Sequence, residues 1–291
     1  MDVQSFINYL SFEKRYSAHT ITSYQNDLNQ FFGYLEKIYR LTDIGIISHF
    51  HIRSWMVELM DIGVSPRSIN RKLSSLKSFF KYLLRQERIK VNPMNKIVAP
   101  KAGKRLPSYI RESEMSKLSE LKANSDYSTY RDYLIMHILY YTGIRRSELI
   151  NLKDKDINLS GGIKVLGKGN KERIIPVLPD LMKEIKEYQI IRNNSFEGKS
   201  EFLLLTDKGV KLYPKFVYNT VKRYLSLVTT SQKKSPHILR HSFATHLSNR
   251  GAELKAIKEL LGHANLSATQ IYMHNSVDKL KETYNSAHPK A

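Results

Sequence analysis

Apolar residues recur at helical spacing along most of the chain. Between residues 18 and 39, the apolar side chains share one face of a helix: Ile21, Tyr24, Leu28, Phe31, Leu35 and Ile38. Spacing of three and four residues is typical of an amphipathic helix. Similar patterns predict helices over residues 3–16 and 48–60. A fourth helix begins at Ser65-Pro66, because Ser is a favourable N-cap and Pro suits the first turn. The first hundred residues are therefore predicted to form a small all-helical bundle.

The rest of the chain is also mostly helical, with one predicted β-hairpin. β-rich runs over residues 163–166 and 173–177 flank Gly167-Lys168-Gly169-Asn170, a sequence that favours a hairpin turn. Helical patterns cover residues 130–141, 145–152, 181–192, 215–228, 236–249 and 253–261. Three of these patterns are followed by a glycine, as expected of helix C-caps: Gly143, Gly251 and Gly262. The fold class is predicted to be mainly α, with a helical N-terminal domain and a mixed α/β, mostly helical C-terminal domain.

The helix that begins at Ser65-Pro66 is predicted to have one apolar and one basic face. Its apolar stripe consists of Ile69, Leu73, Leu76, Phe80 and Leu83. About 200° around the helix, cations repeat with the same spacing. A merely solvated face is the alternative, but such a face usually mixes both signs of charge, so we expect DNA contact. The candidate DNA-binding residues are Arg67, Arg71, Lys77, Lys81 and Arg85, followed by Lys104 and Arg105.

The overall charge supports a polyanionic partner. The 291 residues include 47 Lys and Arg against 27 Asp and Glu, which gives a formal charge of +20. More than half of this excess lies between Arg67 and Arg105. Nucleic acid is the commonest large polyanion, and neutralising its phosphates releases condensed counterions. An anionic membrane surface is the rival, but a protein that binds a membrane surface would more often show an exposed amphipathic helix with large apolar residues. No apolar run is long enough to span a bilayer either, so we expect double-stranded DNA and no membrane.

The absence of cysteine narrows the chemistry. Without cysteine, the chain cannot form a disulfide, a Cys-ligated zinc site or an iron–sulfur cluster, and it has no thiol nucleophile. His237 and His241 have the spacing of a zinc-binding pair, but no carboxylate lies between them. No secretory signal is evident at Met1. We therefore expect a cytoplasmic protein with no metal and no cofactor.

Residues 93–107 are predicted to separate two domains. They contain three prolines, a glycine and several cations without apolar periodicity, a composition that suits an extended basic linker. The expected division is an N-terminal domain of residues 1–92, this linker, and a C-terminal domain of residues 108–291. Two domains joined in this way could close around a duplex.

The candidate chemistry lies in short polar segments of the second half. Taken singly, each has an ordinary explanation; Arg145 could pair with Glu148 on a helix surface, and Lys168 could be a solvated turn. Taken together, they provide cations that grip phosphate oxygens, a proton donor, imidazoles and a hydroxyl nucleophile. This inventory suits cleavage of a phosphodiester without a metal ion. The candidate catalytic residues are Arg145, Lys168, His237, Arg240, His263 and Tyr272.

The order of these six residues resembles the tyrosine recombinases, the lambda-integrase-like family. The spacings His237-x-x-Arg240, 23 residues to His263 and nine to Tyr272 agree with that family (263 − 240 and 272 − 263). The resemblance covers nearly the whole chain, and its compact length and hairpin sequence are most like the bacterial Xer recombinases, XerC and XerD. Two positions depart from the pattern, Ile144 and Lys290, where leucine and arginine are usual.

The resemblance implies a fold and a role for each residue. The N-terminal bundle would be a SAM-like core-binding domain, and the C-terminal domain would be catalytic. Tyr272 would attack the phosphate and form a 3′-phosphotyrosyl link. Arg145 and Arg240 would hold the phosphate oxygens, and Lys168 would protonate the leaving 5′ oxygen. His237 would accept or relay the tyrosine proton. His263 would hydrogen-bond the phosphate, and Glu148 would support an arginine.

The resemblance also implies partners. The family acts as a tetramer on two duplexes, each with inverted half-sites, so we expect a homotetramer or a heterotetramer with a Xer paralogue. The segment Ser276 to Ala287 resembles the C-terminal helix that such proteins exchange with a neighbour. An FtsK-like translocase is a further expected partner, because Xer proteins resolve chromosome dimers at cell division. The alternatives are a mobile-element integrase and, in a different class, a non-catalytic DNA-binding protein.

Overall fold

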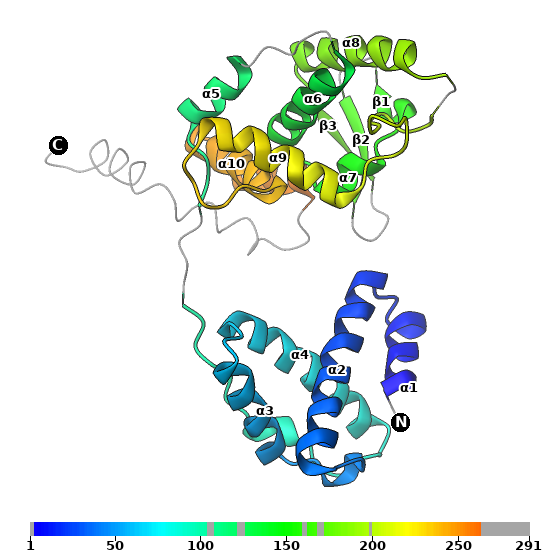
Figure 1. Cartoon of the computed structure of the whole chain (residues 1–291), viewed down its shortest axis with the longest axis vertical. Coiled ribbons are helices and arrows are strands. Elements are labelled where there is room, and N and C mark those ends of the chain that lie inside the picture. Colours follow the sequence, from blue (N-terminus) through cyan, green and yellow to red (C-terminus); the bar gives the residue numbers. More distant parts are fainter. Residues whose placement is uncertain are drawn as a thin grey trace, which may run out of the picture. The chain divides into compact units, whose positions relative to one another are not determined.

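The computed structural model describes residues 3–103, 108–120, 126–158, 162–167, 172–197 and 200–262. The chain divides into two compact units, Met1–Arg105 and Leu106–Ala291, and both are drawn in Figure 1. Each unit has a hydrophobic core of its own.

Helices make up the first unit. They are α1 (Val3–Asn8), which continues as a π-helical turn (Tyr9–Glu13), α2 (Ala18–Tyr39), α3 (His49–Asp61) and α4 (Pro66–Arg85), with 3₁₀ turns at Ile44–Ile46 and Pro93–Lys96. The predicted helices are confirmed, although the first ends at residue 13 instead of 16. Arg15 adopts a positive φ of 50°, which a helix does not tolerate. The side chains of Ser17 and Ser65 cap α2 and α4 as N-caps.

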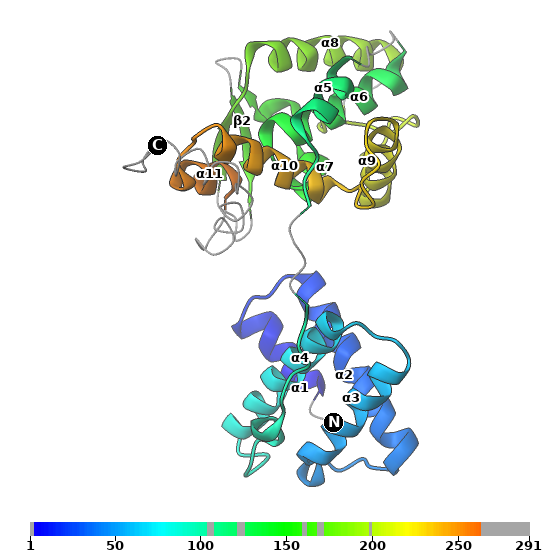
Figure 2. The ribbon, with the colours of Figure 1, turned by 90° about the vertical axis from the view of Figure 1, so that its left-hand side faces the viewer.

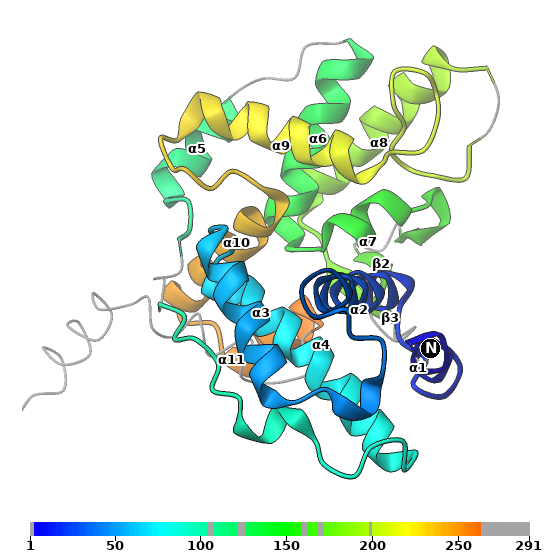
Figure 3. The same ribbon diagram turned by 60° about the horizontal axis from the view of Figure 1, so that its bottom comes forward.

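Aromatic side chains form much of the core of this unit. Phe31 of α2 lies with its ring centroid 5.1 Å from that of Trp55 in α3 and 6.4 Å from that of Phe80 in α4. Helix α4 packs against both α2 and α3 (Figure 3). The predicted apolar stripe of α4 is buried, and all its basic residues except the buried Lys72 lie on the exposed side. The amphipathic pattern therefore fixes which face of α4 is available to a partner.

Residues 93–100 differ from the expected extended linker. Pro93 and Met94 belong to the 3₁₀ turn Pro93–Lys96, and both are buried. The side-chain amide of Asn70 donates to the carbonyl of Pro100 at 3.0 Å. Two apolar residues are too few to give a periodic pattern, but they are enough to hold the segment on the helical core.

The second unit combines helices with a small antiparallel sheet. Its helices are α5 (Glu112–Glu120), α6 (Tyr127–Thr142), α7 (Arg146–Asn151), α8 (Pro179–Ser195), α9 (Pro214–Val228), α10 (Pro236–Asn249) and α11 (Leu254–Leu261). The described strands follow the order β1 (Ile157–Asn158), β2 (Gly162–Leu166) and β3 (Glu172–Pro176). The β2–β3 pairing confirms the predicted hairpin strands, with Val165 opposite Arg173. Helix α5 was not predicted, and neither was strand β1, which has only two residues.

Helix α6 is the centre of the second unit, with α8, α9 and α10 packed around it (Figure 1). Its middle turns are buried on all sides, including Leu134, Ile135, Met136, Ile138 and Leu139. Helix α11 lies beside β3 and α10 (Figure 2). The C-terminal ends of α6 and α11 both lead into the candidate site.

Candidate active site

A glycine turn after α6 places Arg145 at the start of α7. Gly143 has a φ of 60°, in the left-handed region, and a Cβ here would lie 2.4 Å from the ring of Phe243. No other residue fits this turn without strain and collision. The backbone N–H of Arg145 donates to Oε2 of Glu148 at 2.7 Å, so Glu148 caps the helix that follows.

Glu148 is a buried carboxylate shared by two arginines. Its Oε1 accepts from Nη1 of Arg145 at 2.8 Å, and Arg173 donates to both oxygens at 3.0 Å. Burial acts to raise the pKa of Glu148, but the hydrogen bonds from Arg173 and Arg145 outweigh it and hold the pKa below its usual range. The carboxylate is therefore charged at neutral pH and orients both guanidinium groups.

Arg240 reaches the same place from α10. Its buried guanidinium donates from Nη1 to the carbonyl of Gly143 and from Nη2 to the carbonyl of Leu261, both at 2.6 Å. Nη2 of Arg145 donates to the carbonyl of Gly262 at 3.0 Å. The structure thus brings Arg145 and Arg240 together between the ends of α6 and α11, although 95 residues separate them in the sequence (240 − 145).

His237 lies one helical turn before Arg240 on α10, and its side chain is exposed. Partial enclosure by the protein, followed by the positive charges of Arg146, Arg240 and Arg145, lowers the pKa of its imidazole. A lowered pKa keeps the ring neutral at neutral pH, which is the form that accepts a proton.

The other predicted catalytic residues lie outside the described residues: Lys168, His263 and Tyr272. In the sequence, Lys168 falls between β2 and β3, and His263 directly follows Gly262. Arg173 is the residue that sequence reasoning missed. The signal was a cation within a β-rich run, which alternation places on one face of a strand.

Beneath the predicted DNA-binding face of α4 lies a carboxylate of α2, Asp27. Arg67, Lys77 and Lys81 are exposed on α4. Arg71 is half-exposed and donates to Oδ1 of Asp27 at 2.8 Å. Lys104 and Arg105 lie outside the described residues.

Arg85, the last candidate on α4, is also exposed. Its Nη1 donates to the hydroxyl of Tyr9 at 3.1 Å. The cations of α4 are thus carried on a surface that α2 and the π-helical turn after α1 help to hold.

Metal sites and membrane-spanning helices were also sought among the described residues. Within them, no group of three or more His, Cys, Asp and Glu side chains lies close enough to hold a metal ion. Among the helices of the same residues, none is long and apolar enough to cross a membrane.

Comparison with known proteins identifies the family. Residues 108–279 match the Phage integrase family, and residues 3–87 match the Phage integrase N-terminal SAM-like domain. The chain belongs to the phage integrase family. This result confirms the predicted resemblance to tyrosine recombinases and the predicted fold class of a SAM-like helical domain and a mostly helical catalytic domain.

Relatives of similar length support a finer assignment. The chain is 37% identical to Tyrosine recombinase XerC of Chlorobaculum parvum, over 99% of this chain and 94% of the relative. It is 38% identical to Tyrosine recombinase XerC of Staphylococcus haemolyticus, over 99% and 96%. The crystal structure of XerH site-specific recombinase bound to palindromic difH substrate in a post-cleavage complex has a TM-score of 0.77 at 25% identity. It covers 91% of this chain and 78% of that chain. The protein is a tyrosine recombinase of the Xer type.

Proposed function

We propose that the protein is a site-specific DNA recombinase that cuts and rejoins strands through Tyr272. The observation that carries the proposal is the convergence of Arg145 and Arg240 between the ends of α6 and α11. Two fixed guanidinium groups on neighbouring carbonyls form a site for one phosphate. Their main-chain partners hold them in place before the substrate binds, which is how preorganised donors lower a barrier.

The proposed cleavage step transfers a phosphoryl group from DNA to the enzyme. The Tyr272 oxygen bonds to phosphorus while the bond to the 5′ oxygen breaks. His237 takes the tyrosine proton, and Lys168 supplies a proton to the 5′ oxygen. Arg145 and Arg240 stabilise the charge that grows on the non-bridging oxygens, and His263 adds a hydrogen bond. Because the phosphotyrosyl link keeps the energy of the phosphodiester, a 5′-hydroxyl from another duplex can reverse the step without ATP.

A suicide substrate tests this function. We use a duplex selected from random DNA by the protein itself and nicked so that the 5′ fragment diffuses away. The wild-type protein is expected to form a covalent adduct, and Tyr272→Phe is expected to form none. Tyr218→Phe, at an exposed position of α9, is the matched control and should retain the adduct. An adduct that persists in Tyr272→Phe would overturn the assignment of the nucleophile.

The cellular role that we propose is the resolution of chromosome dimers at cell division. It is supported by the similarity to XerC proteins and to XerH on palindromic difH substrate. The protein would act in the cytoplasm, where bacterial chromosomes lie, as a tetramer with itself or with a Xer paralogue on two sites with inverted half-sites. An FtsK-like translocase would activate the assembly.

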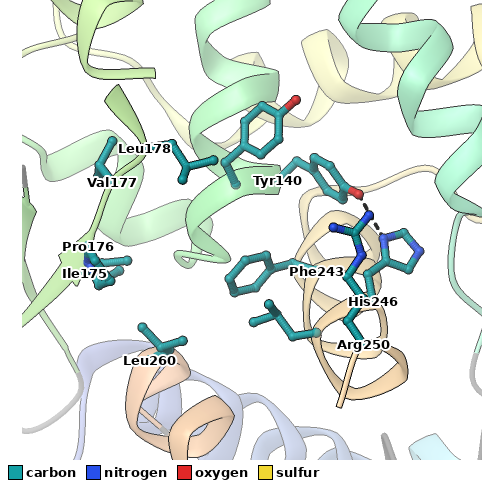
Figure 4. Close-up of a pocket in the computed structure, with 11 residues that line it drawn as sticks. Tyr140, Ile175, Pro176, Val177, Leu178, Phe243, His246, Arg250 and Leu260 are labelled. Carbon is teal, nitrogen blue, oxygen red and sulfur yellow. Dashed lines mark hydrogen bonds between the residues drawn. The ribbon is translucent and has the colours of Figure 1, made fainter. Parts of the chain in front are cut away.

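An apolar pocket offers a place for subunit exchange. A cavity of about 420 Å³ lies between the end of α6, β3, α10 and α11 (Figure 4). Apolar side chains dominate its lining, and Leu178 on its rim is 64% exposed. On its polar side, the hydroxyl of Tyr140 and Nδ1 of His246 are 2.9 Å apart. We propose that this pocket receives the C-terminal segment of a neighbouring subunit.

The C-terminal sequence matches the pocket in character. Val277, Leu280 and Tyr284 would share one face of a helix. The segment lies outside the described residues, so the match rests on its sequence pattern. Burying such an apolar face against the pocket would stabilise the contact by about 25 cal/mol for each Å² removed from water.

Leu178→Glu tests the exchange. It places a charge on the pocket rim, so we expect assembly on a full site to fall at least about tenfold, the penalty of one poorly solvated charge. Binding of one subunit to a single half-site should not change. Ile190→Glu is the control, because Ile190 of α8 is as exposed as Leu178 but does not line the pocket. Gel-shift titration on half-sites and full sites separates the two effects, and unchanged assembly in Leu178→Glu would contradict the pocket's role.

A further inference from the structure

We propose that Arg173 is a positioning residue that holds Arg145 ready for the phosphate, acting through Glu148 and the end of α11. The inference rests on the proposed function, because it assigns to Arg145 the phosphate contact described above. Arg173 comes from β3 and is not one of the six predicted catalytic residues.

The side chain of Arg173 joins three elements. From β3, its Nη1 and Nη2 donate to the two carboxylate oxygens of Glu148 in α7. Its Nε donates to the carbonyl of Leu260 in α11 at 2.9 Å. The side chain is only 14% exposed. A planar fork that meets a carboxylate with two parallel bonds fixes both partners in direction, which a lysine cannot do.

Each oxygen of Glu148 serves both arginines. Oε1 accepts from the side chains of Arg145 and Arg173, and Oε2 accepts from the backbone N–H of Arg145 and from Arg173. Two cations and one anion leave one positive charge at this place. Without Arg173, the buried carboxylate would pair with Arg145 alone and cancel the charge that the phosphate needs. Arg173 therefore keeps the net charge of this group positive and keeps Arg145 oriented.

Arg173 also fixes the second partner of Arg145. A Cβ on Gly262 would lie 3.1 Å from Nη1 of Arg173, so the guanidinium packs directly against this glycine. The carbonyl of the same glycine accepts the hydrogen bond from Nη2 of Arg145. Arg173 thus binds the carboxylate of Glu148 and packs against Gly262, the residue whose carbonyl also holds Arg145.

The test replaces Arg173 and, as a control, Arg192, which makes the same kinds of hydrogen bond elsewhere in the second unit. Arg192 also holds a carboxylate with two bonds, to Asp154 at 3.0 and 2.8 Å, and donates to the main-chain carbonyls of Phe202 and Leu203. Arg173→Met, Arg173→Lys and Arg192→Met are assayed by single-turnover cleavage of the selected, nicked duplex at saturating protein. The assay temperature is well below the melting temperature of every variant.

We expect Arg173→Met to lower the cleavage rate constant by about 100-fold, the typical effect of misplacing a catalytic group by 1 Å. Arg173→Lys should lose about tenfold, because it keeps the charge without the fork. The dissociation constant for the duplex should stay within about threefold in both, because most of the affinity comes from other cations. Arg192→Met should cleave at the wild-type rate. A rate in Arg173→Met equal to that of Arg192→Met overturns the proposal.

A neutral substrate shows whether the defect passes through an arginine. When a methylphosphonate replaces the scissile phosphate, one non-bridging oxygen and its charge are gone, so Arg145 matters less. We expect the ratio of wild-type to Arg173→Met rates to shrink to about a tenth of its value on phosphate for one of the two diastereomers. An unchanged ratio on both overturns the positioning role. Adduct formation by the wild type and its loss in Tyr272→Phe, measured alongside, report separately on the proposed function.

Discussion

Single buried carboxylates organise cations in both units of this protein. Glu148 does so in the second unit, and Asp27 does so in the first. Asp27 of α2 is 1% exposed and accepts from Arg71 at 2.8 Å, from Lys72 at 3.1 Å and from Ser75 at 2.8 Å, all on α4. Lys72 is buried and also donates to Gln30. The carboxylate of Asp27 therefore holds the basic side of α4 in place, so the positions of its cations depend on α2.

We predict that Asp27→Asn destabilises the first unit by about 3 kcal/mol, because removing one partner of a buried ion pair leaves uncompensated charge. The single tryptophan, Trp55, lies in the core of this unit, so its fluorescence during urea unfolding reports on the first unit. Asp61→Asn, at an exposed end of α3, is the control and should leave the midpoint unchanged. A midpoint for Asp27→Asn equal to that of the control would show that the buried pair contributes nothing.

At the scale of elements, the sequence predicted the helix spans well, because a span depends mainly on residues close together in the same helix. The spans of α2 and α10 agree with the prediction residue for residue, because their apolar spacing, the Ser17 cap of α2 and the Pro in the first turn of α10 act locally. The spacing of His237 and Arg240 is one helical turn, so their shared location was predictable too. The bond from Arg173 to Glu148 was not, since it forms only when β3 packs beside α7. The 3₁₀ turn at Pro93–Lys96 was not predicted either, because it too depends on packing against other elements.

At the scale of the whole molecule, α10 concentrates histidines whose charge opposes folding. Partial enclosure by the protein is the largest cause that lowers the pKa of the exposed His237, and burial is the largest cause for His241 and His246. Positive neighbours add to the effect, Arg146 for His237 and Lys233 for His241. All three rings belong to the second unit, so, among the residues that the structure describes, the histidines that disfavour folding in acid lie there.

We predict that the second unit loses stability as the pH falls from 7.5 to 5.5. In this window the unfolded chain binds protons at its histidines near pH 6.5, whereas the folded chain, with lowered pKa values, binds fewer. The slope of unfolding free energy with pH follows that difference, so the full stability is present well above pH 6.5 and is lost as the pH falls through 6.5 toward the lowered pKa values. Far-UV circular dichroism follows the helices of both units, and Trp55 fluorescence follows the first unit alone, so the gap between the two transitions isolates the second. His246→Gln removes one of the three titrating rings and should flatten the decline. A second unit whose midpoint rises or stays constant on acidification would contradict the lowered pKa values.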